Sequence, residues 1–131
     1  MTNKINVLST IKILKELIKK DIYFIFFSSE FVFNGKKKNF SEKDKAKPIN
    51  IYGKQKLKVE KFIIKNAKKY SIFRIAKTYG DELNDNTLIT NYLKNILIGQ
   101  KKFIVASDQF FSPLFLGDLK KIIKIFTKKK N

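Results

Sequence analysis

Two serines, a tyrosine and a lysine are the residues of this chain whose types and spacing could support chemistry. Tyr52 and Lys56 lie four residues apart in NIYGKQKLKVEKF, a stretch patterned like a helix, so both side chains project from one helix face. A phenol has a pKa of about 10 and needs a nearby cation to work as an acid or base at neutral pH. Lys56 could be that cation, although the pair taken alone favours the plainer interpretation of an aromatic residue beside a solvated lysine.

Ser28 and Ser29 directly follow the apolar run IYFIFF. Parallel α/β sheets bind ligands at the carboxyl ends of their strands, so a hydroxyl at this point could hold a substrate carbonyl oxygen while Tyr52 transfers a proton. No side chain supplies a hydride, so this arrangement implies a nicotinamide cofactor. The simpler alternative for the two serines is a strand terminus or a cap for nearby backbone groups.

The elements that must position these groups alternate between helix and strand. The uncharged run at 22–27 is typical of a strand buried on both faces, and the long polar stretch 28–50 predicts a functional loop. This order predicts an α/β fold with a mostly parallel, doubly wound, partial Rossmann-like sheet in a single domain, 1–131. We predict helices at 4–20, 51–69, 86–98 and from 117, and strands at 22–27, 71–76 and 103–106.

The composition narrows the classes of function. The 131 residues are 44% apolar and include 13 phenylalanines, which is enough for one compact core. Cysteine and histidine are absent, which excludes disulfides and thiolate chemistry and removes the commonest metal ligand, so we predict no metal site. We find no signal peptide and no apolar run long enough to span a membrane, and therefore expect a soluble, cytoplasmic protein without membrane contact.

The net charge of +18 raises the question of nucleic-acid binding. Of the 29 basic residues, 28 are lysine and only Arg74 is arginine, whereas recognition of bases and phosphates favours the planar guanidinium. The lysines are also spread over the whole chain together with many Ile and Asn, a combination encoded by AT-rich codons. We therefore favour a genomic composition bias over a nucleic-acid site, and keep DNA binding as a third and lower hypothesis.

Four segments resemble the extended short-chain dehydrogenase/reductases, and within them the dTDP-4-dehydrorhamnose reductase group of sugar-nucleotide enzymes. In chain order these are FFSSEFVFNG, SEKDKAKPINIYGKQKLKVEKF, IFRIAKTYG and VASDQFFSPLFLGDL. Together they cover nearly the whole chain, and four motifs in the correct order are much more specific than a Tyr-Lys pair. The resemblance therefore reverses the balance in favour of Tyr52 and Lys56 as a catalytic pair.

The resemblance implies a role for each matching residue, with NADPH or NADH as cofactor and a nucleotide sugar as substrate. Asp118 matches an acidic residue of the family but equally fits a helix N-terminal carboxylate. Lys77 and Leu114 depart from the family pattern, which leaves the particular sugar open. The implied catalytic residues are Ser29, Tyr52 and Lys56, the cofactor-binding residues are Ser28, Tyr52 and Lys56, and the substrate-binding residues are Glu30, Phe31, Asp108, Gln109, Ser112 and Pro113.

The glycine-rich turn that holds the dinucleotide in this family has no counterpart here. No two of the five glycines lie close enough to build it, so we expect a fragment that lacks the amino-terminal half of the nucleotide fold and binds the cofactor weakly by itself. An incomplete or decayed gene is favoured over a split enzyme completed by an amino-terminal fragment, and a homo-oligomer stays open. The alternative functions are a nucleotide-sugar epimerase or dehydratase and a non-catalytic binding or regulatory module.

Overall fold

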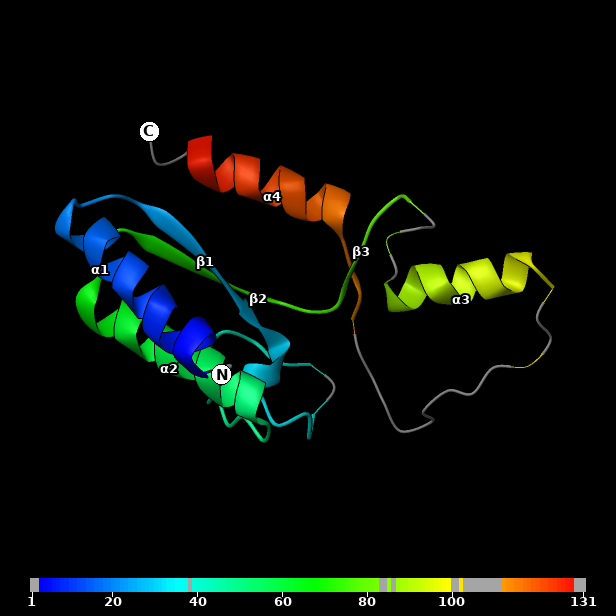
Figure 1. The fold of residues 1–131 in the computed structure, drawn as a ribbon, viewed down its shortest axis with the longest axis horizontal. Coiled ribbons are helices and arrows are strands. Elements are labelled where there is room, and N and C mark those ends of the chain that lie inside the picture. Colours follow the sequence, from blue (N-terminus) through cyan, green and yellow to red (C-terminus); the bar gives the residue numbers. More distant parts are fainter. Residues whose placement is uncertain are drawn as a thin grey trace. The chain divides into compact units, whose positions relative to one another are not determined.

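The computed structural model describes residues 3–37, 39–82, 85, 87–99, 102 and 112–128. They belong to two compact units, Met1–Ile75 and Ala76–Asn131, each of which contains helices and a pair of parallel strands (Figure 1). The predicted α/β class with parallel strands is confirmed. The prediction of a single domain over 1–131 stays a prediction, and the two units are described separately.

The first unit begins with a helix, as predicted, but the first turns of this helix are wound differently from an α-helix. The π-helix η1 (Lys4–Ser9) runs directly into α1 (Thr10–Lys19). The hydroxyls of Ser9 and Thr10 donate to the carbonyl oxygens five residues earlier, over 3.2 and 3.5 Å. This spacing is that of a π-helix, so these side chains reinforce the wider winding.

The end of α1 determines where the first strand begins. Asp21 has a left-handed backbone with φ of 52°, and the amides of Asp21 and Ile22 donate to the carbonyls of Ile18 and Leu17, each over 3.0 Å. This pair of bonds is the Schellman motif, which closes a helix. Ile22 therefore belongs to the helix end, and β1 (Phe24–Ser29) begins two residues later than the predicted 22–27 and includes both serines.

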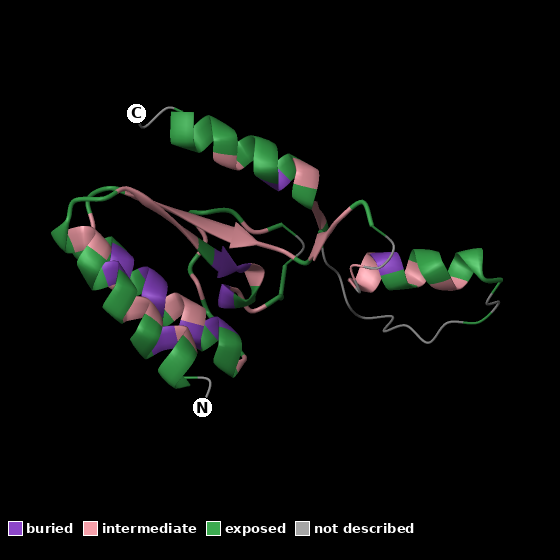
Figure 2. Ribbon diagram, turned by 45° about the horizontal axis from the view of Figure 1, so that its top comes forward, coloured by how far each residue is buried: buried purple, intermediate pink, exposed green. Residues whose placement is uncertain are grey.

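Two helices cover one face of a parallel strand pair in the first unit. Strand β1 pairs with β2 (Tyr70–Ile75) in register from Phe24 opposite Tyr70 to Ser29 opposite Ile75, and α1 lies beside α2 (Ile51–Asn66) on the sheet (Figure 1). The buried residues gather between the helices and the sheet, where Figure 2 shows purple on α1 and α2. The core consists of Val7, Leu14, Val59 and Ile63, packed against half-buried neighbours that include Phe24, Phe26 and Ile72.

The predicted burial of the first strand on both faces is wrong at Phe27, which is 38% exposed. Side chains alternate across a strand, so Phe27 points away from the face on which Phe24 and Phe26 pack against the helices. Phe27 contacts Phe73 of β2 edge to face, with ring centres 6.0 Å apart. An uncharged run thus identified the strand correctly but overstated its burial.

The second unit is built on two strands that the sequence did not predict. Strands β3 (Thr78–Tyr79) and β4 (Leu114–Phe115) pair in parallel, and they are too short to show a periodicity. Helices α3 (Leu88–Leu97) and α4 (Leu116–Lys128) match the predicted helices at 86–98 and from 117. The predicted strand at 103–106 lies outside the described residues.

Asp85 holds the start of α3 and gives a prediction about acid stability. Its carboxylate accepts hydrogen bonds from the Thr90 hydroxyl, from the amide of Thr87 over 2.9 Å and from the amide of Gly80 over 2.8 Å. Together these hydrogen bonds lower the pKa of Asp85 from 3.8 to about 2, and the bond from Thr90 is the largest cause. Because the folded pKa lies below the unfolded value, the stabilisation is complete above pH 3.8 and is lost as the pH falls toward 2.

We expect the amide signal of Gly80 to follow this titration in NMR spectra, with a midpoint near pH 2. Asp85→Asn is the control, because its side chain does not titrate and the Gly80 signal should then stay constant over the same range. A Gly80 midpoint at or above pH 3.8 in the unmodified protein contradicts the prediction.

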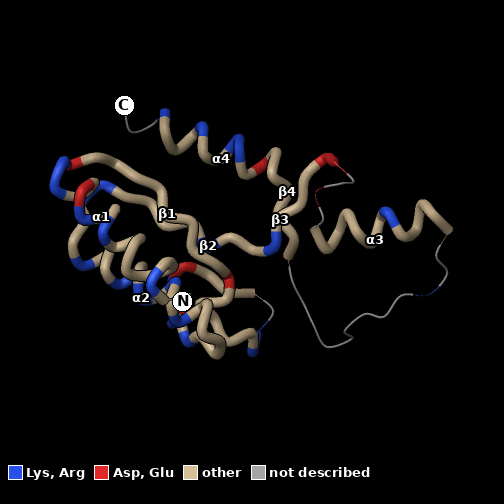
Figure 3. Tube along the Cα trace, viewed as in Figure 1, with Lys and Arg blue, Asp and Glu red and all other residues tan. Residues whose placement is uncertain are grey.

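Lysine residues are distributed along α1, α2 and α4, whereas α3 carries one lysine, Lys94 (Figure 3). Acidic residues are few in each unit, in keeping with the net charge of +18. Among the described residues, no helix has the length and apolar character that a membrane crossing requires. The hypothesis that the charge reflects composition bias stays a prediction.

Candidate active site at the carboxyl end of β1

The last two residues of β1 are the most buried part of this strand. Ser29 accepts a hydrogen bond at its Oγ from the amide of Phe31 over 3.3 Å, and this contact starts the short helix η2 (Glu30–Val32). Its hydroxyl proton is thereby left available for donation, because the oxygen acts as acceptor in this contact. Ser28 is 2% exposed, and within the described part of the chain its Oγ has no hydrogen-bond partner.

Tyr52 lies in the first turn of α2, which is capped by Asn50. The Asn50 side chain accepts a hydrogen bond from the amide of Gly53 over 2.7 Å, as an N-cap residue does. The ring of Tyr52 meets the ring of Phe31 edge to face, with centres 6.1 Å apart and planes at 78°. Tyr52 is 43% exposed, and its ring is held against the turn that follows β1.

Lys56 lies one helical turn after Tyr52 and reaches back to β1. Its Nζ lies 5.6 Å from the centre of the Tyr52 ring and 5.0 Å from that of Phe26, and it donates to the carbonyl oxygen of Phe27 over 2.8 Å. Burial lowers the pKa of Lys56 below its ordinary value of 10.5. The ammonium group therefore lies beside the tyrosine, as the helical spacing predicted, and is anchored to the strand end.

We expect Lys56 to lose its proton at a lower pH than 10.5. The charged form is disfavoured in the folded protein, so this lysine should add stability as the pH rises through its folded pKa toward 10.5. The titration of the ¹³C-dimethylated lysines by NMR measures this pKa, and Lys56→Arg identifies the relevant signal by its disappearance. A Lys56 signal that titrates at or above 10.5 contradicts the prediction.

A buried ion pair, which was not predicted from the sequence, joins α2 to β2 beside this region. Glu60 is fully buried, and its carboxylate accepts from Nε of Arg74 over 3.1 Å and from a terminal guanidinium nitrogen over 2.8 Å. The guanidinium also lies over the ring of Phe33, 5.0 Å from its centre. The position of Glu60 between the core residues Val59 and Ile63, together with the lone arginine in a strand, was the signal that could have revealed the pair.

A second polar contact joins the first helix to α2. Asn6, in the π-helix η1, donates from its side-chain amide to the buried side-chain carbonyl of Gln55 over 3.0 Å. Gln55 directly precedes Lys56 on α2. The amino-terminal half of α2 is thus held by polar contacts to η1 and to β1.

The other predicted site residues are not all in the first unit. Glu30 and Phe31 form the start of η2 and lie within the first unit. Ser112 and Pro113 are exposed and precede β4 in the second unit, whereas Asp108 and Gln109 lie outside the described residues. Asp118 lies in the first turn of α4 and pairs with Lys121 over 3.0 Å. This position fits the interpretation of Asp118 as a carboxylate at a helix N-terminus.

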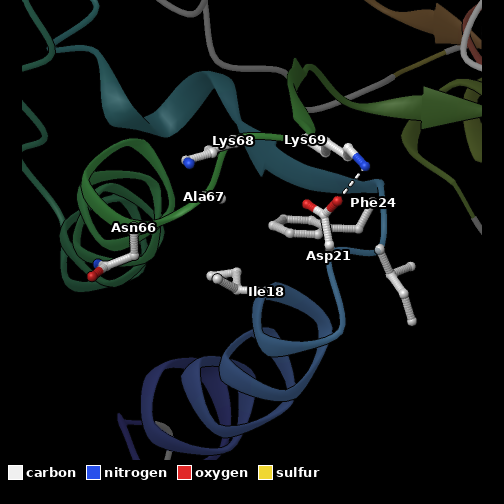
Figure 4. Close-up of a pocket in the computed structure, with 8 residues that line it drawn as sticks. Ile18, Asp21, Phe24, Asn66, Ala67, Lys68 and Lys69 are labelled. Carbon is white, nitrogen blue, oxygen red and sulfur yellow. Dashed lines mark hydrogen bonds and ion pairs between the residues drawn. The ribbon is translucent and has the colours of Figure 1, made fainter.

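A hollow of about 200 Å³ lies at the opposite end of β1 and contains none of the predicted site residues (Figure 4). Phe24 and Ala67 line it, and an ion pair between Lys69 and Asp21 closes one side. This end of the sheet faces the carboxyl ends of α1 and α2. The described residues also contain no group of three or more acidic, histidine or cysteine side chains that could hold a metal ion.

The chain has recognisable relatives. It matches the family described as RmlD substrate binding domain over residues 1–131. It is 26% identical over 129 residues to methionine adenosyltransferase 2 subunit beta of Rattus norvegicus, which covers 98% of this chain and 39% of that protein. The chain thus spans about two fifths of the length of this relative.

Solved structures of dTDP-4-dehydrorhamnose reductases share the fold. An ortholog from Clostridium acetobutylicum is 28% identical, with a TM-score of 0.81 over 98% of this chain and 45% of that one. The Bacillus anthracis enzyme in complex with NADP superposes with a TM-score of 0.82 over 92% of this chain and 42% of that one, at 24% identity. The likeness to these proteins confirms the predicted partial Rossmann-like α/β fold.

Proposed function

Because the chain belongs to the RmlD substrate binding domain family, we propose that it forms the catalytic part of an NAD(P)-dependent reductase of a keto-sugar nucleotide. The observation that carries this proposal is the placement of the Lys56 ammonium 5.6 Å from the Tyr52 ring, anchored to the strand that ends in Ser29. The similarity to dTDP-4-dehydrorhamnose reductases supports a substrate of that type.

Tyr52 is the proton donor in this proposal. Its phenol donates to the oxygen of the substrate carbonyl as that carbonyl is reduced to an alcohol, and the Lys56 ammonium stabilises the phenolate that is left. Ser29 donates its hydroxyl proton in a hydrogen bond to the same carbonyl oxygen, since its Oγ already accepts from Phe31. Acid/base work of this kind needs no histidine, and the chain has none.

The residues near the end of β1 fit the nicotinamide end of a dinucleotide. The buried Ser28 Oγ is without a partner among the described residues, and the Lys56 ammonium has three donors, one of which is used by Phe27. Ser28, Tyr52 and Lys56 would hold the nicotinamide ribose. The bound cofactor, NADPH or NADH, supplies the hydride. This chain spans 39% of the length of the Rattus norvegicus relative. We assign no further cofactor contacts to the residues of this chain.

The nucleotide sugar would contact residues on both sides of the phenol in sequence. Phe31 is 42% exposed and its ring contacts Tyr52, which suits a surface beside the reacting group, and Glu30 precedes it. The resemblance adds Asp108, Gln109, Ser112 and Pro113 to the substrate site. The proposal leaves the identity of the sugar to experiment.

The test is product analysis with a panel of keto-sugar nucleotides and NADPH or NADH. Consumption of the reduced cofactor together with a reduced sugar supports the proposal, whereas an epimerised or dehydrated sugar without net cofactor consumption identifies the related epimerase or dehydratase chemistry. The reductase proposal fails if neither kind of reaction is found, either for the chain alone or for the chain joined to the remaining sequence of a relative.

A binding or regulatory role is the second candidate, and one observation favours it. Several relatives carry the name methionine adenosyltransferase 2 subunit beta, so a chain of this family can be a subunit of another enzyme. Calorimetry with NADPH and NADH separates the candidates when combined with the assay. Cofactor binding without turnover of any sugar nucleotide favours the binding role, and turnover excludes it.

A further inference from the structure

Gly53, the third residue of α2, lies at a point of very close packing. A Cβ atom built on Gly53 would lie 2.0 Å from the carbonyl oxygen of Phe31, 2.7 Å from its carbonyl carbon and 3.0 Å from the Cβ of Pro48. Gly53 is itself buried. The nearest obstacle is a backbone group, which cannot rotate away as the end of a side chain could.

Space, and not backbone conformation, explains this glycine. Only Gly35 and Gly99 have positive φ among the described glycines, so Gly53 has a backbone that any residue can adopt. Glycine in a helix costs about 1 kcal/mol relative to alanine. Gly53 carries this cost in the first turn of α2 although its backbone conformation does not require glycine. We conclude that glycine is needed here because the backbones of α2 and Phe31 approach closely.

The contact joins the two elements that carry the proposed catalytic groups. Phe31 donates its amide to Ser29, presents its carbonyl to Gly53 and packs its ring edge to face on Tyr52. The helix that carries Tyr52 is therefore fixed to the end of β1 at Phe31. One turn later, Lys56 fixes the same helix to the carbonyl of Phe27.

We infer that Gly53 is a positioning residue that sets the separation between Tyr52 and the Ser29 turn; this inference rests on the proposed function. Any side chain at this position forces the first turn of α2 and the turn of Phe31 apart. The contact has to lengthen from 2.0 Å to at least 3.0 Å, a shift of about 1 Å or more. A displacement of about 1 Å in a reacting geometry lowers a rate by roughly 100-fold.

The test is Gly53→Ala in the full chain, with selectively ¹³C-labelled tyrosine rings observed by NMR. We expect the Tyr52 ring signal, assigned with Tyr52→Phe, to move because its edge-to-face contact with Phe31 opens, while circular dichroism stays unchanged. Lys54→Ala, one residue further along the exposed side of the helix, is the control and should leave the Tyr52 signal in place. A folded Gly53→Ala chain with an unmoved Tyr52 signal overturns the inference.

Two further measurements keep the test decisive. If Gly53→Ala does not fold, the dipolar coupling between the α protons of Gly53 and the ¹³C-labelled carbonyl carbon of Phe31 in the unmodified chain takes its place, and its absence overturns the inference. Adding Pro48→Gly to Gly53→Ala removes the Pro48 Cβ, which lies 3.0 Å from the added Cβ, but leaves the Phe31 carbonyl in place. The double variant should therefore not restore the Tyr52 signal to its original position. Restoration by Pro48→Gly would assign the contact to the loop and overturn the inference.

The turnover measurement separates this inference from the proposed function. With reductase activity present, Gly53→Ala should lower kcat by roughly 100-fold with little change in KM. An unchanged kcat overturns the positioning role even when the ring signal moves. If no reductase activity is found at all, the proposed function fails, and the NMR result still decides whether Gly53 sets the contact between Tyr52 and Phe31.

Discussion

Tyr52→Phe should reduce the rate of carbonyl reduction by roughly 10²–10⁴-fold, since the phenol is the proposed proton donor. The substitution removes a single oxygen and keeps the ring that packs against Phe31. Because Tyr52 is 43% exposed, loss of its hydroxyl should change the free energy of unfolding little. Steady-state kinetics with the substrate found by product analysis, together with urea denaturation, measures both quantities.

Tyr70→Phe is the matched control for Tyr52→Phe. Tyr70 is half-buried at the first position of β2, at the end of the sheet opposite to Ser29, and its ring stacks on Phe24. It should retain full activity. A Tyr52→Phe chain that keeps its rate would remove Tyr52 from the reaction, and an equal loss of rate in Tyr70→Phe would point to a general effect on folding.

The ion pair between Arg74 and Glu60 should have the largest effect on stability. Arg74→Leu leaves the Glu60 carboxylate fully buried without its guanidinium partner, and an unpaired buried charge costs about 3–5 kcal/mol of unfolding free energy. Urea denaturation of the first unit, followed through the amide signals of β1 and β2, measures this loss. A loss below about 1 kcal/mol contradicts the prediction.

Two controls separate the buried charge from other causes. The double variant Glu60→Leu with Arg74→Leu replaces both charges with apolar side chains and should recover most of the lost stability, as apolar replacement of buried pairs often does. Lys121→Leu breaks the exposed pair with Asp118 and should cost no more than about 1 kcal/mol. A double variant as unstable as Arg74→Leu would place the effect in packing around Phe33 and not in the charge.

The long elements were predictable because each carries its own signal. The helix around Val7, Leu14 and Ile18 follows its apolar spacing, and the strands β1 and β2 follow from mostly apolar runs between helices. Boundaries were less predictable, because the amides of Asp21 and Ile22 close α1 and delay β1. The short strands β3 and β4 have two residues each, too few for any pattern.

The candidate site was predictable only in part. The common face of Tyr52 and Lys56 follows from 3.6 residues per turn and needs no knowledge of the rest of the chain. The buried pair of Glu60 and Arg74 joins residues 14 positions apart in different elements, so no local pattern contains it. The catalytic and binding roles of the site residues stay predictions.

The sequence by itself determined which groups share a helix face, because backbone hydrogen bonds impose one geometry on every helix. Only the tertiary structure decided what lies opposite that face: the Phe27 carbonyl that holds Lys56, the Phe31 ring against Tyr52 and the carbonyl pressed on Gly53. These contacts depend on how closely α2 packs on the end of β1. That distance is set by side-chain volumes from several elements at once, and no single segment encodes it.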